Sequence, residues 1–253
     1  DVNQLQHNIM WGQKGNYLEV PTDCPQRDER LGWTGDAQVF IRTGAFNFDV
    51  GAFFTKWLND LEDSQKPDGA VPHVAPDVLS NPETGQVAAG VAAWADAAVI
   101  CPWAIYVCYG DSRVLERHYG MMTAWIDYQR QTSRDLIRPK MGFGDWLAMD
   151  APGRASDQSA TPKDLIGTAY FAHTTRLMAR VAEILGKQDD AERFGRLADE
   201  VVEAFNREFV TPAGRVLGDT QTVYSLALRF DLLDEEKRRI AAARLCEDIE
   251  RHK

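Results

Sequence analysis

The sequence has no apolar run long enough to cross a bilayer, which takes about 20 residues, and no signal peptide at its start. It also lacks an excess of positive charge. The 28 Lys and Arg residues stand against 38 Asp and Glu, for a formal net charge of -10. Nucleic acids and anionic membranes are bound through basic patches. The composition therefore argues against both as partners.

Cysteine is scarce, and its spacing builds no recognisable site. The four cysteines include no C-x-x-C pair, so neither a zinc site nor a disulfide framework is indicated. Cys101 and Cys108 lie in an apolar segment, where free thiols are usually buried, and we expect both in the core. We predict no metal and no cofactor.

Linkers, low-complexity runs and internal repeats are also missing. A length of 253 residues without such a boundary is typical of one large domain. The first residue is Asp rather than Met. We therefore expect the chain to be part of a longer protein.

No run of alternating apolar and polar residues indicates a strand, whereas helical periodicity is frequent. Residues 189–209, for example, repeat apolar side chains at spacings of three and four, as an amphipathic helix does. Residues 1–20 show little periodicity. Eight helices are predicted, over 37–48, 50–65, 91–110, 112–132, 164–186, 189–209, 220–233 and 235–251. This pattern favours an all-α array of antiparallel hairpins.

Proline, glycine and charge concentrate in three stretches, 21–35, 66–90 and 134–163, which we expect to be loops at one end of the helical array. The second contains His73, and a lone loop histidine is usually solvated. The third places Asp145 beside Trp146. Carboxylates and aromatic rings together suit a sugar, which needs proton donors, hydrogen bonds and flat apolar faces.

The first of these loops is the most distinctive part of the chain. Prolines at its start and glycines at its end keep it out of helix. Residues 21–38, the loop and the three residues after it, hold four carboxylates, two arginines and one tryptophan: Asp23, Asp28, Glu29, Asp36, Arg27, Arg30 and Trp33.

Backbone geometry predicts that Asp23 and Glu29 lie together. They share a face if the segment is extended, with a period of two, and also if it follows a polyproline path, with a period near three. Paired carboxyl groups are what acid–base chemistry at an acetal requires. A structural reading stays open, in which Asp36 caps the next helix and both arginines form surface ion pairs.

A metal site built from Asp23, Asp28 and Asp36 is the weaker reading. The spacing is not that of an EF-hand, since no central Gly and no terminal Glu are present.

The segment DCPQRDERLGWTGDAQ resembles the signature of the bacterial α-L-rhamnosidases of glycoside hydrolase family 78. The likeness continues in family order through WADAAVICPW, GFGDWL, TAYFAH and TQTVYSLAL. The resemblance implies an (α/α)6 barrel, two concentric rings of six helices each. With about eight helices, residues 1–253 would be the N-terminal part of such a six-hairpin domain.

The resemblance also implies roles for single residues and a small substrate, a glycoside of L-rhamnose. Glu29 falls on the position of the general acid. Trp94 and Trp146 fall on tryptophans that wall the sugar pocket, and Asp96 and Asp145 are chosen because they lie near these tryptophans in the sequence. The residues expected to bind the sugar are Asp23, Arg27, Trp33, Asp36, Trp94, Asp96, Asp145 and Trp146.

Members of the family invert configuration, so a second carboxylate must act as general base. The resemblance places that base well C-terminal to the acid, and no residue of this chain matches it. We therefore expect a chain that keeps the acid half of the site. A general acid needs a raised pKa, whereas a nearby cation lowers it. We accordingly predict that Arg27 and Arg30 pair with Asp23 or Asp28 rather than with Glu29.

Two other functions stay open. One is another (α/α)6 inverting hydrolase, or a phosphorylase, although a phosphorylase needs an anion pocket that the sequence does not indicate. The other is a non-catalytic sugar-binding or helical interaction module.

Overall fold

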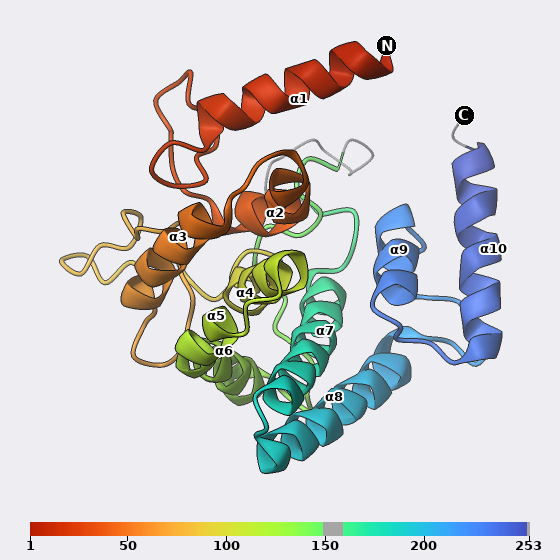
Figure 1. Cartoon of the computed structure of the whole chain (residues 1–253). Helices are drawn as coiled ribbons and strands as arrows, with labels where there is room; N and C mark the ends of the chain where they lie inside the picture. Colours follow the sequence, from red (N-terminus) through yellow and green to blue (C-terminus); the bar gives the residue numbers. More distant parts are fainter. Residues whose placement is uncertain (149–158, 252–253) are drawn as a thin grey trace. The chain divides into compact units, whose positions relative to one another are not determined.

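The computed structural model of the chain describes residues 1–148 and 159–251. Over these residues the regular structure is helical, and β pairing is confined to isolated bridges. The helices, labelled in Figure 1, are α1 (Val2–Asn16), α2 (Thr34–Asn47), α3 (Gly51–Ser64), α4 (Ala97–Tyr109), α5 (Arg113–Arg117), α6 (Tyr119–Thr132), α7 (Lys163–Ile184), α8 (Gln188–Phe209), α9 (Gln221–Arg229) and α10 (Glu235–Arg251).

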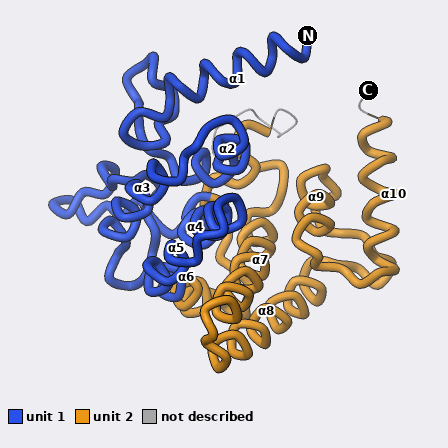
Figure 2. The backbone as a smooth tube through the Cα atoms, in the orientation of Figure 1, with its two compact units in different colours: residues 1–90, 94–125 blue, residues 91–93, 126–253 orange. Residues whose placement is uncertain are grey.

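The chain divides into two compact units, coloured separately in Figure 2. The first holds residues 1–90 and 94–125, with α2 and α3 both packed on α4. Its core is aromatic and aliphatic, because each helix turns its apolar stripe inward. Fully buried side chains in this unit include Ile41, Phe54, Trp57, Leu58, Leu61, Val99, Leu115 and Trp125.

The second unit is built from two helix pairs, α7 with α8 and α9 with α10. A tight turn joins α7 to α8: Gly186 takes a left-handed φ of 69°, and the Lys187 N–H donates to the Ala182 carbonyl. Glycine suits such a turn because it has no Cβ to clash. The apolar stripe predicted for residues 189–209 is confirmed, with Phe194, Leu197, Ala198, Val201 and Phe205 all buried in α8.

The prediction of eight helices is wrong in two places. Residues 1–20 contain the 15-residue helix α1, which buries only Gln13 and so shows no apolar stripe. The segment 112–132 is two helices, α5 and α6, interrupted at His118. The imidazole of His118 is fully buried, and its Nδ1 lies 2.8 Å from the carboxylate of Glu62. This tertiary contact overrides the local periodicity.

The two thiols predicted to be buried differ. Cys101 lies in the core, whereas Cys108 is exposed near the end of α4. The apolar composition of this helix does not imply burial on every side, since Val107 is also exposed. Among residues 1–148 and 159–251, no helix has the length and apolar character that crossing a membrane demands.

Two phenylalanines of the first unit test this packing. Phe54 is fully buried and meets Trp57 edge-on at 5.8 Å, whereas Phe46 is 90% exposed. We expect Phe54→Ala to lower the free energy of unfolding by about 3–5 kcal/mol, because it removes buried surface and leaves a cavity. Phe46→Ala, the matched control, should change it by roughly 0.5 kcal/mol or less. Urea unfolding measures both, and equal effects would contradict the core described here.

Candidate active site

The loop between α1 and α2 is closed at its neck by Asp23 and Leu31. The Asp23 N–H donates to the Leu31 carbonyl at 3.0 Å, and the Leu31 N–H donates to Asp23 Oδ1 at 3.2 Å. Inside the neck, Cys24 and Arg30 take left-handed backbone conformations, with φ of 37° and 55°. Such residues are strained away from their preferred regions. These two conformations, with the hydrogen bonds at the neck, turn the segment back on itself.

This turn brings two carboxylates together. One ligand atom each from Asp23, Cys24 and Glu29 lies within 4.8 Å of the others, and all three residues are half-buried. Asp23 and Glu29 do lie together, as predicted, but a turn brings them together and not the extended path on which the prediction was based. Cys24 is an addition that the sequence did not single out. The three residues could donate to a cation, but the guanidinium of Arg27 already pairs with Glu29, and we assign no metal here.

Glu29 is held on both oxygens. The indole Nε1–H of Trp33 donates to Oε1 at 3.0 Å, and Arg27 pairs with Oε2. The expectation that Arg27 would pair with Asp23 or Asp28 is thus wrong. Arg30 does pair with Asp28, at 3.3 Å, as predicted. Arg27 and Glu29 are only two residues apart, and the Glu29 N–H also donates to the Arg27 carbonyl at 2.8 Å, so the two side chains are near neighbours.

The carboxyl groups of the loop differ in pKa. Partial burial raises the pKa of Glu29, but hydrogen bonds from Trp33 and Asp23 and the charge of Arg27 outweigh it, so that the net pKa is lowered. Desolvation raises the pKa of Asp23, and the neighbouring Glu29 raises it further. As the pH falls, Asp23 therefore takes up a proton before Glu29 does.

Asp36 lies in the first turn of α2, where the helix dipole favours a negative charge. It is not the N-cap, which is Trp33. The residue is exposed, yet neighbouring atoms remove part of its carboxyl group's hydration and raise its pKa. The negative charges of Asp23 and Glu29 add to that shift. Asp36 is therefore in electrostatic contact with both.

The second proline-rich loop supports the first through backbone pairing. The Thr34 N–H donates to the His73 carbonyl and the Ala75 N–H to the Gly32 carbonyl, each at 2.9 Å. The predicted neighbourhood of these two loops is confirmed. His73 is half-buried rather than solvated, and burial lowers the pKa of its imidazole to about 4. It is accordingly neutral at pH 7.

Trp94 lies directly on the start of α2. A Cβ at Gly35 would meet the indole of Trp94 at 2.7 Å, so only glycine permits this approach. Asp96, predicted to contact substrate, is fully buried and accepts a hydrogen bond from Trp125 Nε1 at 3.0 Å. Its carboxylate faces the interior of the unit, where it anchors the start of α4.

Asp145 and Trp146 belong to the second unit. The Asp145 carboxylate accepts hydrogen bonds from Ser159 and from the Thr161 hydroxyl, the latter at 2.7 Å, and so closes the loop ahead of α7. Trp146 is 50% exposed and meets Phe143 edge-on, with ring centroids 5.7 Å apart. The third loop also includes residues 149–158, which lie outside the described residues.

Comparisons with known proteins agree with the fold. All residues from 1 to 253 match the model of the bacterial alpha-L-rhamnosidase 6 hairpin glycosidase domain. The chain belongs to this family. Alpha-L-rhamnosidases of Formosa agariphila and Streptomyces avermitilis are 45% and 47% identical to it, each over 98% of the chain. The chain spans 26% and 23% of their respective lengths.

Solved structures of family members superpose closely on it. A Streptomyces avermitilis alpha-L-rhamnosidase complexed with L-rhamnose matches with a TM-score of 0.89 and 46% identity. Native alpha-L-rhamnosidase from Aspergillus terreus matches with a TM-score of 0.91 and 34% identity. Each match covers 99% of the chain, and 23% and 29% of those structures. The all-α six-hairpin architecture expected from the sequence is therefore confirmed for this rhamnosidase-family chain.

Sequence reasoning missed Cys24 and Gly35. Cys24 was visible inside the family signature, but a thiol gives no periodic signal. Gly35 follows Thr34 at the start of α2, where a glycine would ordinarily count against a helix. The need for glycine at position 35 becomes apparent only in the structure, where the indole of Trp94 covers this position.

The contact between Gly35 and Trp94 predicts that Gly→Ala lowers the free energy of unfolding here, although it usually raises it within a helix. Alanine is favoured over glycine in a helix by up to about 1 kcal/mol. Gly35→Ala should nevertheless destabilise the protein by roughly 1–3 kcal/mol, because the added methyl collides with the indole. In a Trp94→Ala background, the same substitution should be neutral or stabilising. A double-mutant cycle of unfolding free energies measures this coupling.

The matched control is Gly12→Ala in α1, where no atom lies within 4 Å of the added Cβ. It should stabilise the protein or leave it unchanged. If Gly35→Ala costs the same with and without the indole, the collision is not the cause.

The ion pair at Glu29 predicts a pKa change of defined sign. Arg27→Ala removes a cation that favours the ionised carboxyl, so the pKa of Glu29 should rise. Arg30→Ala is the control, since Arg30 pairs with Asp28 and should leave Glu29 unaffected. Carboxyl 13C resonances followed against pH report both. An unchanged pKa of Glu29 in Arg27→Ala would contradict the pairing.

Proposed function

We propose that the protein to which this chain belongs hydrolyses terminal α-L-rhamnosides with inversion, and that Glu29 is its general acid. The observation that carries the proposal is the carboxyl pair Asp23–Glu29 beside the indole of Trp33, within the segment that resembles the family signature. Family membership and a relative's structure complexed with L-rhamnose support the choice of sugar.

In this proposal, Glu29 protonates the bridging oxygen as the bond to the leaving group breaks. Its lowered pKa in the free chain opposes that role. The raised pKa of Asp23 favours a proton shared by the two carboxyl groups, and Glu29 could donate that proton because a closely coupled pair titrates as a unit. A bound sugar that drew Arg27 towards its hydroxyls would also release Glu29 from the cation that depresses its pKa.

The remaining residues are proposed to bind the sugar. Trp33 and Trp94 offer indole faces for its C–H surfaces. The sugar-binding role of Trp146 rests on the family resemblance alone. Asp23, Arg27 and Asp36 would bind hydroxyls. Both oxygens of Asp145 are engaged within its loop, and Asp96 is buried, so we propose that these two act by positioning their neighbours.

Asp23 does not fit the role of general base. In inverting enzymes the two carboxyl groups stand about 6.5–9.5 Å apart, to leave room for a water. The Asp23 and Glu29 ligand atoms lie within 4.8 Å. In keeping with the family resemblance, we assign the general base to no residue of this chain.

A second candidate function is non-catalytic sugar binding. The pairing of Glu29 with Arg27 favours it, since it keeps the carboxyl group ionised and suited to accepting hydrogen bonds from hydroxyls. Rhamnose binding without turnover, weakened in Glu29→Gln, would support this function over hydrolysis.

Glu29→Gln tests the acid role through the leaving group. A poor leaving group needs protonation, whereas a nitrophenolate departs largely without it. We expect a loss of about 10²–10⁴-fold in kcat/KM on an alkyl rhamnoside and a much smaller loss on nitrophenyl rhamnoside. Steady-state kinetics on the two substrates measure the ratio.

Asp28→Asn is the matched control, because this carboxylate pairs with Arg30 at the outer side of the loop. It should affect both substrates equally and slightly. Equal losses on the two substrates in Glu29→Gln would remove Glu29 from the acid role. If the 253-residue chain turns over neither substrate, L-rhamnose binding to it, measured by calorimetry, still tests the sugar site.

A further inference from the structure

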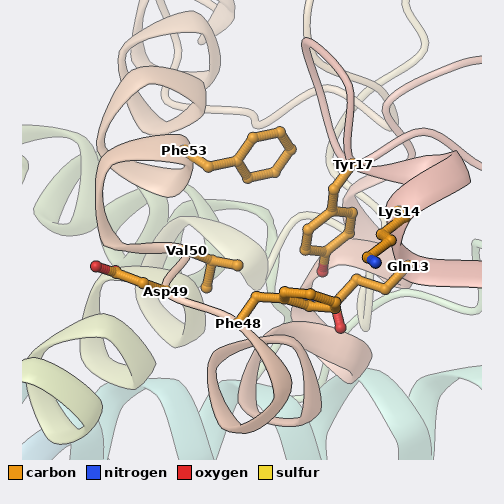
Figure 3. A pocket seen from close by; sticks show the side chains of 7 residues that line it. All are labelled: Gln13, Lys14, Tyr17, Phe48, Asp49, Val50 and Phe53. Atoms are coloured by element: carbon orange, nitrogen blue, oxygen red, sulfur yellow. The ribbon is translucent and has the colours of Figure 1, made fainter. Parts of the chain in front are cut away.

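A cavity of about 240 Å³ opens in the first unit where α1 meets the segment between α2 and α3. Figure 3 shows the side chains that line it. None of the residues predicted to bind the sugar lines it, so it is separate from the candidate active site. The volume corresponds to about eight water molecules at roughly 30 Å³ each. It is smaller than the roughly 300 Å³ or more typical of drug-sized ligands, and a single ring fits it best.

The walls of this cavity are aromatic and held in place. Tyr17 stacks on Phe53 with ring centroids 4.7 Å apart and planes 10° apart, and Phe48 lies opposite. Gln13, at the end of α1, donates to the Gly44 carbonyl of α2 at 3.0 Å, which fixes that end of the helix. Flat apolar walls of this kind stack on the faces of planar rings or on the C–H surfaces of sugars.

The charge at this cavity is positive. The Lys14 ammonium group lies 5.7 Å from the centre of the Phe48 ring and 4.7 Å from that of Trp11. Within the described part of the chain, no carboxylate forms an ion pair with Lys14. Asp49 also lines the cavity, but its carboxylate points away from it in Figure 3 and accepts from the Gly51 N–H.

A second polar group beside the cavity lacks a partner. The hydroxyl of Tyr17 is buried without a hydrogen bond to any described residue, and burial raises its pKa. Buried hydroxyls are nearly always paired, with protein, water or ligand. The hydroxyl lies beside Gly44 and the buried thiol of Cys101, neither of which lines the cavity. A ligand in the cavity would therefore meet the ring of Tyr17 and not its hydroxyl.

We propose that this cavity binds a six-membered ring that carries a carboxylate. The ring would stack on the aromatic walls, and the carboxylate would pair with Lys14. Both an aromatic acid and a sugar acid have this chemistry. The site does not depend on the proposed hydrolysis, since none of its residues belongs to the acid loop.

Two probes with neutral counterparts test the proposal on the 253-residue chain. Benzoate stands for the aromatic acid and D-glucuronate for the sugar acid, with benzamide and D-glucose as the uncharged partners. We expect at least one acid to bind about tenfold or more tightly than its neutral partner, and to weaken with added salt. Protein-observed NMR titration gives the dissociation constants, with shifts expected at Tyr17, Phe48 and Phe53. The acid that binds identifies the source of the ligand.

Lys14→Met keeps the aliphatic stem and removes the charge, so it should abolish the preference for the acid. Lys56→Met is the matched control: this lysine of the same unit pairs with Asp60, outside the cavity. It should leave binding unchanged, as should Glu29→Gln. If neither acid binds more tightly than its neutral partner, or if Lys14→Met binds as the parent chain does, the proposal is wrong.

Discussion

Two backbone hydrogen bonds between distant loops hold the candidate site together. They join Gly32 to Ala75 and Thr34 to His73, and Trp33 lies between them. A side chain at Gly32 would collide with the Ala75 carbonyl, so the approach requires glycine. Because these bonds fix where α2 begins, they also fix the indole that contacts the acid loop. The site is therefore built on a non-local pairing and not on the loop alone.

The indole and the acid loop meet in a small electrostatic unit. Trp33 and Arg27 both donate to Glu29, while Asp23 stands within reach of the same carboxylate. Two acids served by one cation cannot both ionise freely, so the pair separates into an ionised Glu29 and a more readily protonated Asp23. That separation opposes direct proton donation by Glu29. Any hydrolytic cycle must reverse it when substrate enters.

The sequence predicted this site in part, for reasons that can be stated residue by residue. Asp23 and Glu29 share a face in either extended geometry, but six extended residues would hold them about 20 Å apart, so the turn is what brings their carboxylates within 4.8 Å. The choice of Glu29 as the partner of Arg27 was not predicted either. The left-handed conformations of Cys24 and Arg30 reverse the chain, and the sequence gives no sign of them. Contacts across a strained turn lie beyond what spacing can predict.

The helices also divide into those that the sequence predicts and those that it does not. Helix α8 was predictable because it buries a continuous apolar stripe. Helix α1 was not, because it is anchored by the amide of Gln13 and by the Tyr17 ring that follows it. An apolar stripe on α1 would have filled the space between this helix and α2 and α3, because interdigitating side chains leave few voids. An anchor of one amide and one phenol leaves space beside the rings, and the cavity is found there. The absence of an apolar stripe on α1 thus explains both why the sequence does not predict this helix and why space for a ligand remains beside it.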